Sequence, residues 1–260
     1  MNLTILCGYP NSSYARDILR ALNARGMRRV NVVAGNGGAT QKTIKQVWAS
    51  HGLRFPLVAL QWGVRRCADQ VRSLGKVDAT VSDTLQTAVR AQGGQFVCVA
   101  DVNGADCKRT LVKQQVDLMI LGGAPIVRAH ILQVPRVGTL NAHQGALPRF
   151  RGMNVIEWAL LEGTAPTISV HFVDPGVDTG DIVAMEPIPL QPGDQLSSVR
   201  TRSGKIQSEL LARMASLAMQ GALPRRSQCF EDGRQYYSMH PCLKAVAEQR
   251  LQALLDGAAS

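Results

Sequence analysis

The chain has 260 residues, of which 45% are hydrophobic and 18% charged, a balance that is typical of a folded core and argues against disorder. It contains no run of about 18 unbroken apolar residues, which argues against a membrane-spanning helix, and its first residues lack a basic region, so we expect no secretory signal. The net charge of +10 comes from scattered lysines and arginines rather than from a block that would indicate a nucleic-acid-binding arm.

The N-terminal part of the chain predicts the start of a layered fold. Leu3–Cys7 is an apolar run with the profile of a buried strand. The next segment predicts a helix capped by Asn11 or Ser12, and residues 30–34 predict a second strand. A strand, a helix and a strand in this order usually form a parallel unit, so we expect a sheet covered by helices on both faces. Residues 40–94 permit no assignment of elements.

The rest of the chain predicts further strands that alternate with amphipathic helices. The expected strands are 96–100, 118–121, 137–141, 167–173, 182–188 and 235–237. The expected helices are 106–115, 154–162, a long one from 194 to 221, and an Ala- and Leu-rich one in the tail. We therefore predict an α/β fold with a Rossmann-like, mostly parallel sheet in a main domain over 1–221, and a short C-terminal extension of strand and helix over 222–260.

The cysteines give no sign of disulfides or of bound metal. None of the six forms a C-x-x-C pair, and the chain is too large to depend on disulfide staples. Cys7 and Cys98 lie in apolar runs, where a free thiol behaves as a small hydrophobic side chain. We expect free thiols, a cytoplasmic protein and no metal site.

Asn141 and His143 are the first candidate functional residues. Because alternate residues of a strand face the same way, the two side chains project together near the end of the strand, where a loop rich in glycine and proline follows. An amide beside an imidazole can hold one carbonyl oxygen and stabilise negative charge on it. Taken alone the pattern is weak, because asparagine and histidine at a strand end are often turn residues.

The loop Asp174–Asp181 is the second candidate feature. It carries three acidic residues and two glycines, more carboxylates than a turn between two strands requires. If Asp178 lies near His143, its charge raises the pKa of the imidazole and favours imidazolium. The carboxylate could also accept the proton that an attacking amine must lose, directly or through water.

Several short motifs occur in a fixed order and together resemble one family. They are Asn141-Ala142-His143, Leu147-Pro148, Arg151-Gly152, His171-Phe172-Val173-Asp174 and Val177-Asp178-Thr179-Gly180-Asp181-Ile182. This order resembles the formyltransferases, which include glycinamide ribonucleotide transformylase, methionyl-tRNA formyltransferase and the amino-sugar N-formyltransferases. The similarity is closest from Asp117 to Gly221 and weaker before it.

The resemblance implies an enzyme that moves a formyl group from 10-formyltetrahydrofolate to a primary amine. By position in the motifs, the catalytic residues are Asn141, His143 and Asp178, within a catalytic domain over 1–221. The same comparison places the folate against two loops. The residues that it implies for the folate site are Gly123, Ile126, Val127, Asp174 and Val177.

The sequence also departs from the family's patterns, which bears on the acceptor. The segment after the first strand, Gly8–Tyr14, lacks the glycine-rich phosphate loop of the ribonucleotide-transforming members, which argues against their purine-pathway substrate. The residues after Gly221 are too few for the β-barrel domain of the tRNA-directed enzyme, which argues against a nucleic-acid partner. Gln144-Gly145-Ala146 replaces the Pro-Ser-Leu that often follows the histidine, so the detail of the pocket differs.

The expected activity is therefore formyl transfer to a small-molecule amine, such as an amino sugar or a biosynthetic intermediate. Two related activities stay open: hydrolysis of formyltetrahydrofolate by the same residues, and an activity like that of methionyl-tRNA formyltransferase. A nucleotide-dependent oxidoreductase and a binding protein without catalysis are disfavoured. A homodimer is left open. Among neighbouring polar residues, His171 is expected to be structural or positioning and Asn154 to cap a helix.

Overall fold

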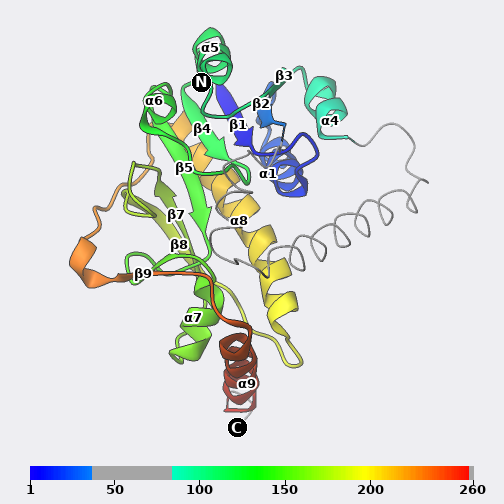
Figure 1. Ribbon diagram of the computed structural model, residues 1–260. Coiled ribbons are helices and arrows are strands. Elements are labelled where there is room, and N and C mark those ends of the chain that lie inside the picture. Colours follow the sequence, from blue (N-terminus) through cyan, green and yellow to red (C-terminus); the bar gives the residue numbers. More distant parts are fainter. Residues whose placement is uncertain (37–83, 258–260) are drawn as a thin grey trace, which may run out of the picture.

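A central sheet organises the protein (Figure 1). The computed structural model describes residues 1–36 and 84–257, so most of the unassigned stretch 40–94 lies outside the described residues. In the described part, the sheet has seven strands in the order β3-β2-β1-β4-β5-β7-β8. Their bounds are β1 Leu3–Cys7, β2 Asn31–Gly35, β3 Phe96–Val99, β4 Leu118–Leu121, β5 Gly138–His143, β7 Thr167–Phe172 and β8 Ile182–Pro187.

Strand direction reverses twice at one side of the sheet, at β7 and again at β8. The five strands from β3 to β5 pair in parallel, whereas β7 runs antiparallel to β5 and β8 antiparallel to β7. Parallel strands need crossover connections, and helices supply them here. The prediction of a mostly parallel sheet with helices is therefore confirmed.

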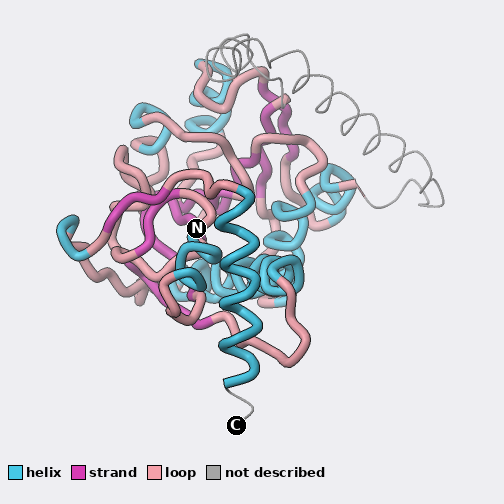
Figure 2. Tube along the Cα trace, turned by 60° about the horizontal axis from the view of Figure 1, so that its bottom comes forward, coloured by secondary structure: helices cyan, strands magenta, loops and turns pink. Residues whose placement is uncertain are grey.

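Helices cover both faces of the sheet, as the two views in Figures 1 and 2 show. Successive residues of a strand face opposite sides, so Ile5 and Val32 pack with α1 and α8, and Leu6 and Val33 pack with α5 and α6. The helices that the structure describes are α1 Ser13–Ala24, α4 Leu85–Ala91, α5 Ala105–Lys113, α6 Ala129–Leu132, α7 Val155–Leu161, α8 Leu196–Met219 and α9 Pro241–Gly257. None of them is long and apolar enough to cross a membrane.

Strand β3 confirms the strand predicted over 96–100 but is less buried than its apolar residues would suggest. A strand is present, but β3 is the last strand at its side of the sheet in the described part of the chain, and the side chain of Cys98 is exposed. An edge strand has a neighbouring strand on one side only, and a run of apolar residues in the sequence does not show whether a strand lies at an edge. The cysteines in the described residues are free thiols, as predicted; Cys67 lies outside them.

A second, two-stranded sheet was not predicted. Strand β6, Phe150–Gly152, pairs in parallel with β9, Arg234–Tyr236, although the sequence predicted a loop at the first of these segments. Asn154 precedes α7 but does not cap it: its backbone is left-handed (φ 54°), and its Oδ1 accepts the N–H of Met239 instead. In both cases residues from the distant tail decide the local structure.

Candidate active site

Asn141 and His143 lie on one face of β5, close to its end. Their neighbours Leu140 and Ala142 point into the core on the side of α1 and α8, so the two polar side chains face the opposite side of the sheet. His143 is only 7% exposed and Asn141 is half-buried. On the adjacent antiparallel strand, His171 is the register partner of Asn141.

Asp178 joins this group from the loop between β7 and β8. Its Oδ2 lies 3.4 Å from Nδ1 of His143 and accepts the N–H of Gly152 at 2.9 Å, and its Oδ1 lies 3.5 Å from Nε2 of His171. Burial raises the pKa of this carboxyl, but the two imidazoles and the Gly152 N–H stabilise the ionised form more strongly and bring the pKa down to about 2. Asp178 is therefore a carboxylate at neutral pH.

His171 orients the amide of Asn141. The Phe172 carbonyl, 2.7 Å from Nδ1 of His171, can only accept, so Nδ1 carries a proton. Nε2 lies 3.3 Å from Nδ2 of Asn141 and 3.5 Å from Oδ1 of Asp178; without a proton it accepts from Asn141, and with a proton it donates to Asp178. Within residues 1–36 and 84–257, the second N–H of the Asn141 amide has no hydrogen-bond partner. This arrangement agrees with the positioning role expected for His171.

The charge of His143 differs from the expectation. Burial lowers the pKa of the ring, and although the Asp178 charge and the Phe150 carbonyl raise it, the net shift is downward. The sequence predicted imidazolium because it revealed the carboxylate but not the burial. Nε2 lies 2.7 Å from the Phe150 carbonyl and so keeps its proton. Nδ1, which faces Asp178, is therefore the ring nitrogen that gains or loses a proton.

Gly152 must be glycine because of the tail strand. Its φ is +97°, and a Cβ there would lie 2.1 Å from the Tyr236 carbonyl oxygen. Gly163 is the control: its φ is +67°, but an added Cβ meets no described atom within 4 Å, so Gly163→Ala costs only the backbone strain of about 1–2 kcal/mol. We expect Gly152→Ala to lower the free energy of unfolding by more than this. Denaturant unfolding of both variants measures the difference, and equal losses would contradict it.

The residues implied for the folate site do not all offer a side chain to a ligand. Ile126 is 86% exposed and Val177 44% exposed, so both present apolar surface. Val127, by contrast, is buried in the core on the side of α5 and α6, and the Asp174 carboxylate accepts from Gly176 N–H and Thr179 Oγ1 within its own turn. Gly123 turns the chain after β4 with a φ of +81°.

A small hollow of about 220 Å³ opens beside the imidazole. It is lined by Ala142, His143, Gln144, Gly152, Asn154, Val155 and Gln207. Behind it, Gln144 donates to Ser203 Oγ at 2.7 Å and Gln207 to the Ala142 carbonyl at 2.7 Å, which ties α8 to the end of β5. The hollow is therefore lined mainly by polar, uncharged groups beside the His143 imidazole.

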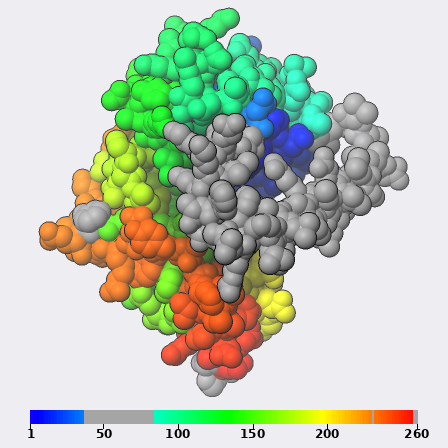
Figure 3. Space-filling view, in the orientation of Figure 1, coloured from blue at the N-terminus to red at the C-terminus, as the bar shows by residue number. Residues whose placement is uncertain are grey.

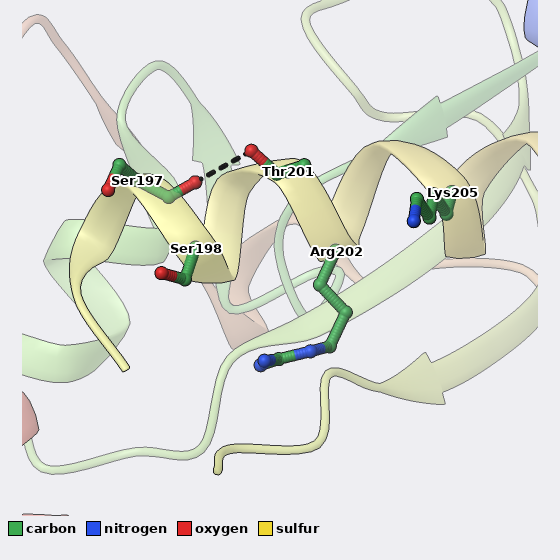
Figure 4. Close-up of a pocket in the computed structure, with 5 residues that line it drawn as sticks. All are labelled: Ser197, Ser198, Thr201, Arg202 and Lys205. Carbon is green, nitrogen blue, oxygen red and sulfur yellow. Dashed lines mark hydrogen bonds between the residues drawn. The ribbon is translucent and has the colours of Figure 1, made fainter. Parts of the chain in front are cut away.

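A larger and more open hollow of about 440 Å³ lies along the first turns of α8 (Figure 4). It is lined by Ser197, Ser198, Thr201, Arg202 and Lys205. Arg202 is already paired with Asp194, and none of the predicted site residues borders this hollow. In the described part of the chain, no group of His, Cys, Asp or Glu side chains is arranged to hold a metal ion. The cluster around His143 is therefore the candidate active site.

The backbone groups of this site were not predicted. The Phe150 carbonyl fixes the proton on His143, and the Gly152 N–H binds Asp178; both belong to β6. The Arg151-Gly152 motif indicated the segment that contributes to the site. A sequence motif does not show which main-chain N–H or carbonyl group contacts the functional side chains.

Comparison with known proteins identifies related sequences over about half of the chain. The family model described as Formyl transferase matches residues 79–215. The methionyl-tRNA formyltransferase of Syntrophus aciditrophicus is 32% identical over 136 residues, 52% of this chain and 42% of the relative. That of Ralstonia nicotianae is 36% identical over 124 residues, 45% of this chain and 37% of the relative. The chain thus spans less than half the length of these curated relatives.

Solved structures share the fold over most of the chain. Glycinamide ribonucleotide transformylase 1 from Symbiobacterium toebii has a TM-score of 0.59 and 19% identity, covering 88% of this chain and 93% of that one. An N-formyltransferase from Helicobacter canadensis, in complex with folinic acid and dTDP-3-aminofucose, has a TM-score of 0.59 and 10% identity. The match covers 97% of this chain and 80% of that one. At these identities the likeness shows the fold alone.

Proposed function

The chain belongs to the formyl transferase family, and we propose that it transfers a formyl group from 10-formyltetrahydrofolate to the primary amine of a small molecule. The observation that carries the proposal is the cluster at the end of β5. His143 and the ionised Asp178 lie 3.4 Å apart, and Nε2 of His171 lies 3.5 Å from Asp178 and 3.3 Å from the amide of Asn141. The amide can hold an oxygen that gains negative charge, and the histidine–carboxylate pair can take up a proton.

The two loops implied for the folate suit a neutral heterocycle. Residues 122–127 and 174–180 contain no lysine or arginine, so they do not offer a phosphate site, whereas Ile126 and Val177 expose apolar side chains against which a ring can pack. We propose that these loops, with Gly123 and Asp174, hold 10-formyltetrahydrofolate. When bound, it supplies the formyl group. Val127 supports this site from within the core rather than as a contact.

The proposed role of Asn141 is to bind the oxygen on which negative charge grows. One N–H of its amide is fixed by His171, and the other is free to donate. A fixed donor in a half-buried site stabilises a developing anion without having to reorient during the reaction. His171 acts through Asn141 and is a positioning residue.

His143 is proposed to take the proton that the attacking amine loses. The ring starts uncharged because burial lowers its pKa, so Nδ1 can accept. Once protonated, the ring is stabilised by the Asp178 carboxylate on one side and keeps its Nε2–H on the Phe150 carbonyl on the other. The positive charge therefore appears beside the oxygen held by Asn141 at the moment when that oxygen becomes negative.

The acceptor is proposed to be small, such as an amino sugar. The polar, uncharged lining of the hollow beside His143 suits hydroxyl groups next to the reacting amine. The Helicobacter canadensis N-formyltransferase, whose structure contains dTDP-3-aminofucose, shares this fold. Transfer to methionyl-tRNA is the second candidate, because the curated relatives carry that name.

The experiment that tests the proposal separates transfer from hydrolysis. We expect 10-formyltetrahydrofolate to be consumed only when an amine is supplied, with one equivalent of formamide product for each tetrahydrofolate formed. The panel comprises amino-sugar nucleotides, glycinamide ribonucleotide and methionyl-tRNA, analysed by mass spectrometry. Formate release that is equally fast without any amine would instead indicate a hydrolase, and turnover with methionyl-tRNA alone would replace the small-molecule acceptor.

A further inference from the structure

The loop that carries Asp178 is held by a side chain from the segment after α8. This segment runs back along the outer strand of the sheet, where Ile182 and Arg226 exchange two backbone hydrogen bonds of 2.8 and 2.9 Å. In Figure 3 the orange residues of this segment adjoin the yellow-green residues that surround β7 and β8. Gln228 follows and donates through Nε2 to two carbonyl oxygens, that of Gly180 at 2.5 Å and that of Asp178 at 3.2 Å.

The backbone of this loop needs such support. Asp178 has a φ of +54°, a left-handed conformation that is unfavourable for any residue with a Cβ. The backbone of Gly180 lies in close contact with β7, because a Cβ there would be 2.0 Å from the Phe172 carbonyl oxygen. One amide group that binds both carbonyls fixes the loop on either side of Thr179, and so fixes the direction in which the Asp178 side chain leaves it.

The orientation of the Gln228 amide shows that its N–H groups are what the site uses. Carbonyl oxygens can only accept, so Nε2 must face Asp178 and Gly180. The other end of the amide, Oε1, is buried and has no hydrogen-bond partner among the residues that the structure describes. A buried, unpaired oxygen is unfavourable. The arrangement is therefore explained by donation to the loop rather than by favourable burial of the whole side chain.

We propose that Gln228 is a positioning residue that holds the carboxylate of Asp178 against Nδ1 of His143, a role that rests on the proposed function. Gln228 touches neither Nδ1 nor the Asp178 carboxylate; it acts through the main chain of the loop. The same segment also restrains the carboxylate from the other side, because the Gly152 N–H that binds it belongs to β6, which pairs with β9. The segment 222–240 thus completes the candidate active site.

Gln228→Met tests the proposal by keeping the length of the side chain and removing its N–H donors. We expect kcat to fall about tenfold, the equivalent of one or two lost neutral hydrogen bonds, with the KM for the folate unchanged. Gln249→Met is the matched control, because Gln249 is exposed on α9, outside the segment 222–240, and the substitution is expected to leave kcat unchanged. Gln228→Ala serves as a second variant if thermal unfolding shows that the methionine disturbs the fold.

A second readout does not depend on turnover. The charged or titratable side chains that face His143 are Asp178, which raises the pKa of the ring, and His171, which lowers it. If Gln228→Met lets the carboxylate move away, the pKa of His143 falls further, and an NMR titration of its Cε1–H resonance in the intact protein measures that shift. An unchanged His143 titration together with an unchanged kcat would overturn the role of Gln228 and leave the proposed function standing. Absence of transfer by the unaltered protein would contradict the proposed function, whereas the titration would still decide the role of Gln228.

Discussion

Asn141→Ala is expected to lower kcat by at least the ~10²–10³-fold that removal of one oxyanion donor typically costs. The physical reason is that, in the proposed mechanism, one N–H of the amide is held by His171 and the other donates to the reacting oxygen. Water that enters the space cannot replace a donor that is already oriented. Steady-state kinetics with the acceptor found in the amine panel measures the effect.

Folate binding is expected to survive this substitution, because Asn141 lies on β5 and the loops proposed to hold the folate follow β4 and β7. Fluorescence titration with a non-transferable folate analogue checks this. Asn141→Asp is the matched variant, since it keeps the shape of the side chain but has no N–H, and we expect an equal or larger loss. Turnover near that of the unaltered protein in either variant would remove Asn141 from the mechanism.

His143→Ala is expected to cause a loss on the order of 10²–10⁴-fold, the usual contribution of a positioned general base. The unaltered protein should also lose activity on the acid side as pH falls through the pKa of His143, because the protonated ring cannot take a proton. Burial lowers that pKa below the ordinary 6.5, so the acid limb of kcat/KM should lie below pH 6.5.

Asp178→Asn separates the charge of the carboxylate from its shape. The carboxylate raises the pKa of His143, so its removal should move the acid limb to still lower pH while kcat falls. The pH dependence of kcat/KM for the two proteins provides the comparison. An acid limb that stays in place in Asp178→Asn, or that persists in His143→Ala, would mean that another group titrates.

The sequence predicted the parts of the site that depend on local spacing. The two-residue period of a strand placed Asn141 and His143 on one face, and the ordered motifs indicated Asp178 in its loop. The alternation of apolar runs and amphipathic helices likewise predicted the sheet and most of its helices. These features are encoded in residues close to one another along the chain.

What the sequence could not predict depends on distant residues. The pairing of β6 with β9, the contact of Gln228 with the Asp178 loop and the diversion of the Asn154 side chain to Met239 all arise from the tail returning to the site. The lowered pKa of His143 follows from its burial, which no motif reports. A domain boundary at residue 221, a homodimer and a cytoplasmic location stay predictions.

The central claim is that the cluster of Asn141, His143 and Asp178 moves a one-carbon group onto nitrogen. The most direct measurement supplies folate whose formyl carbon is ¹³C-labelled, together with the amine panel, and follows the label by NMR. We predict that the label appears in a formamide with the unaltered protein and that this transfer is lost in Asn141→Ala/His143→Ala. Label that passes only to formate, or an undiminished formamide signal from the double variant, would contradict the account.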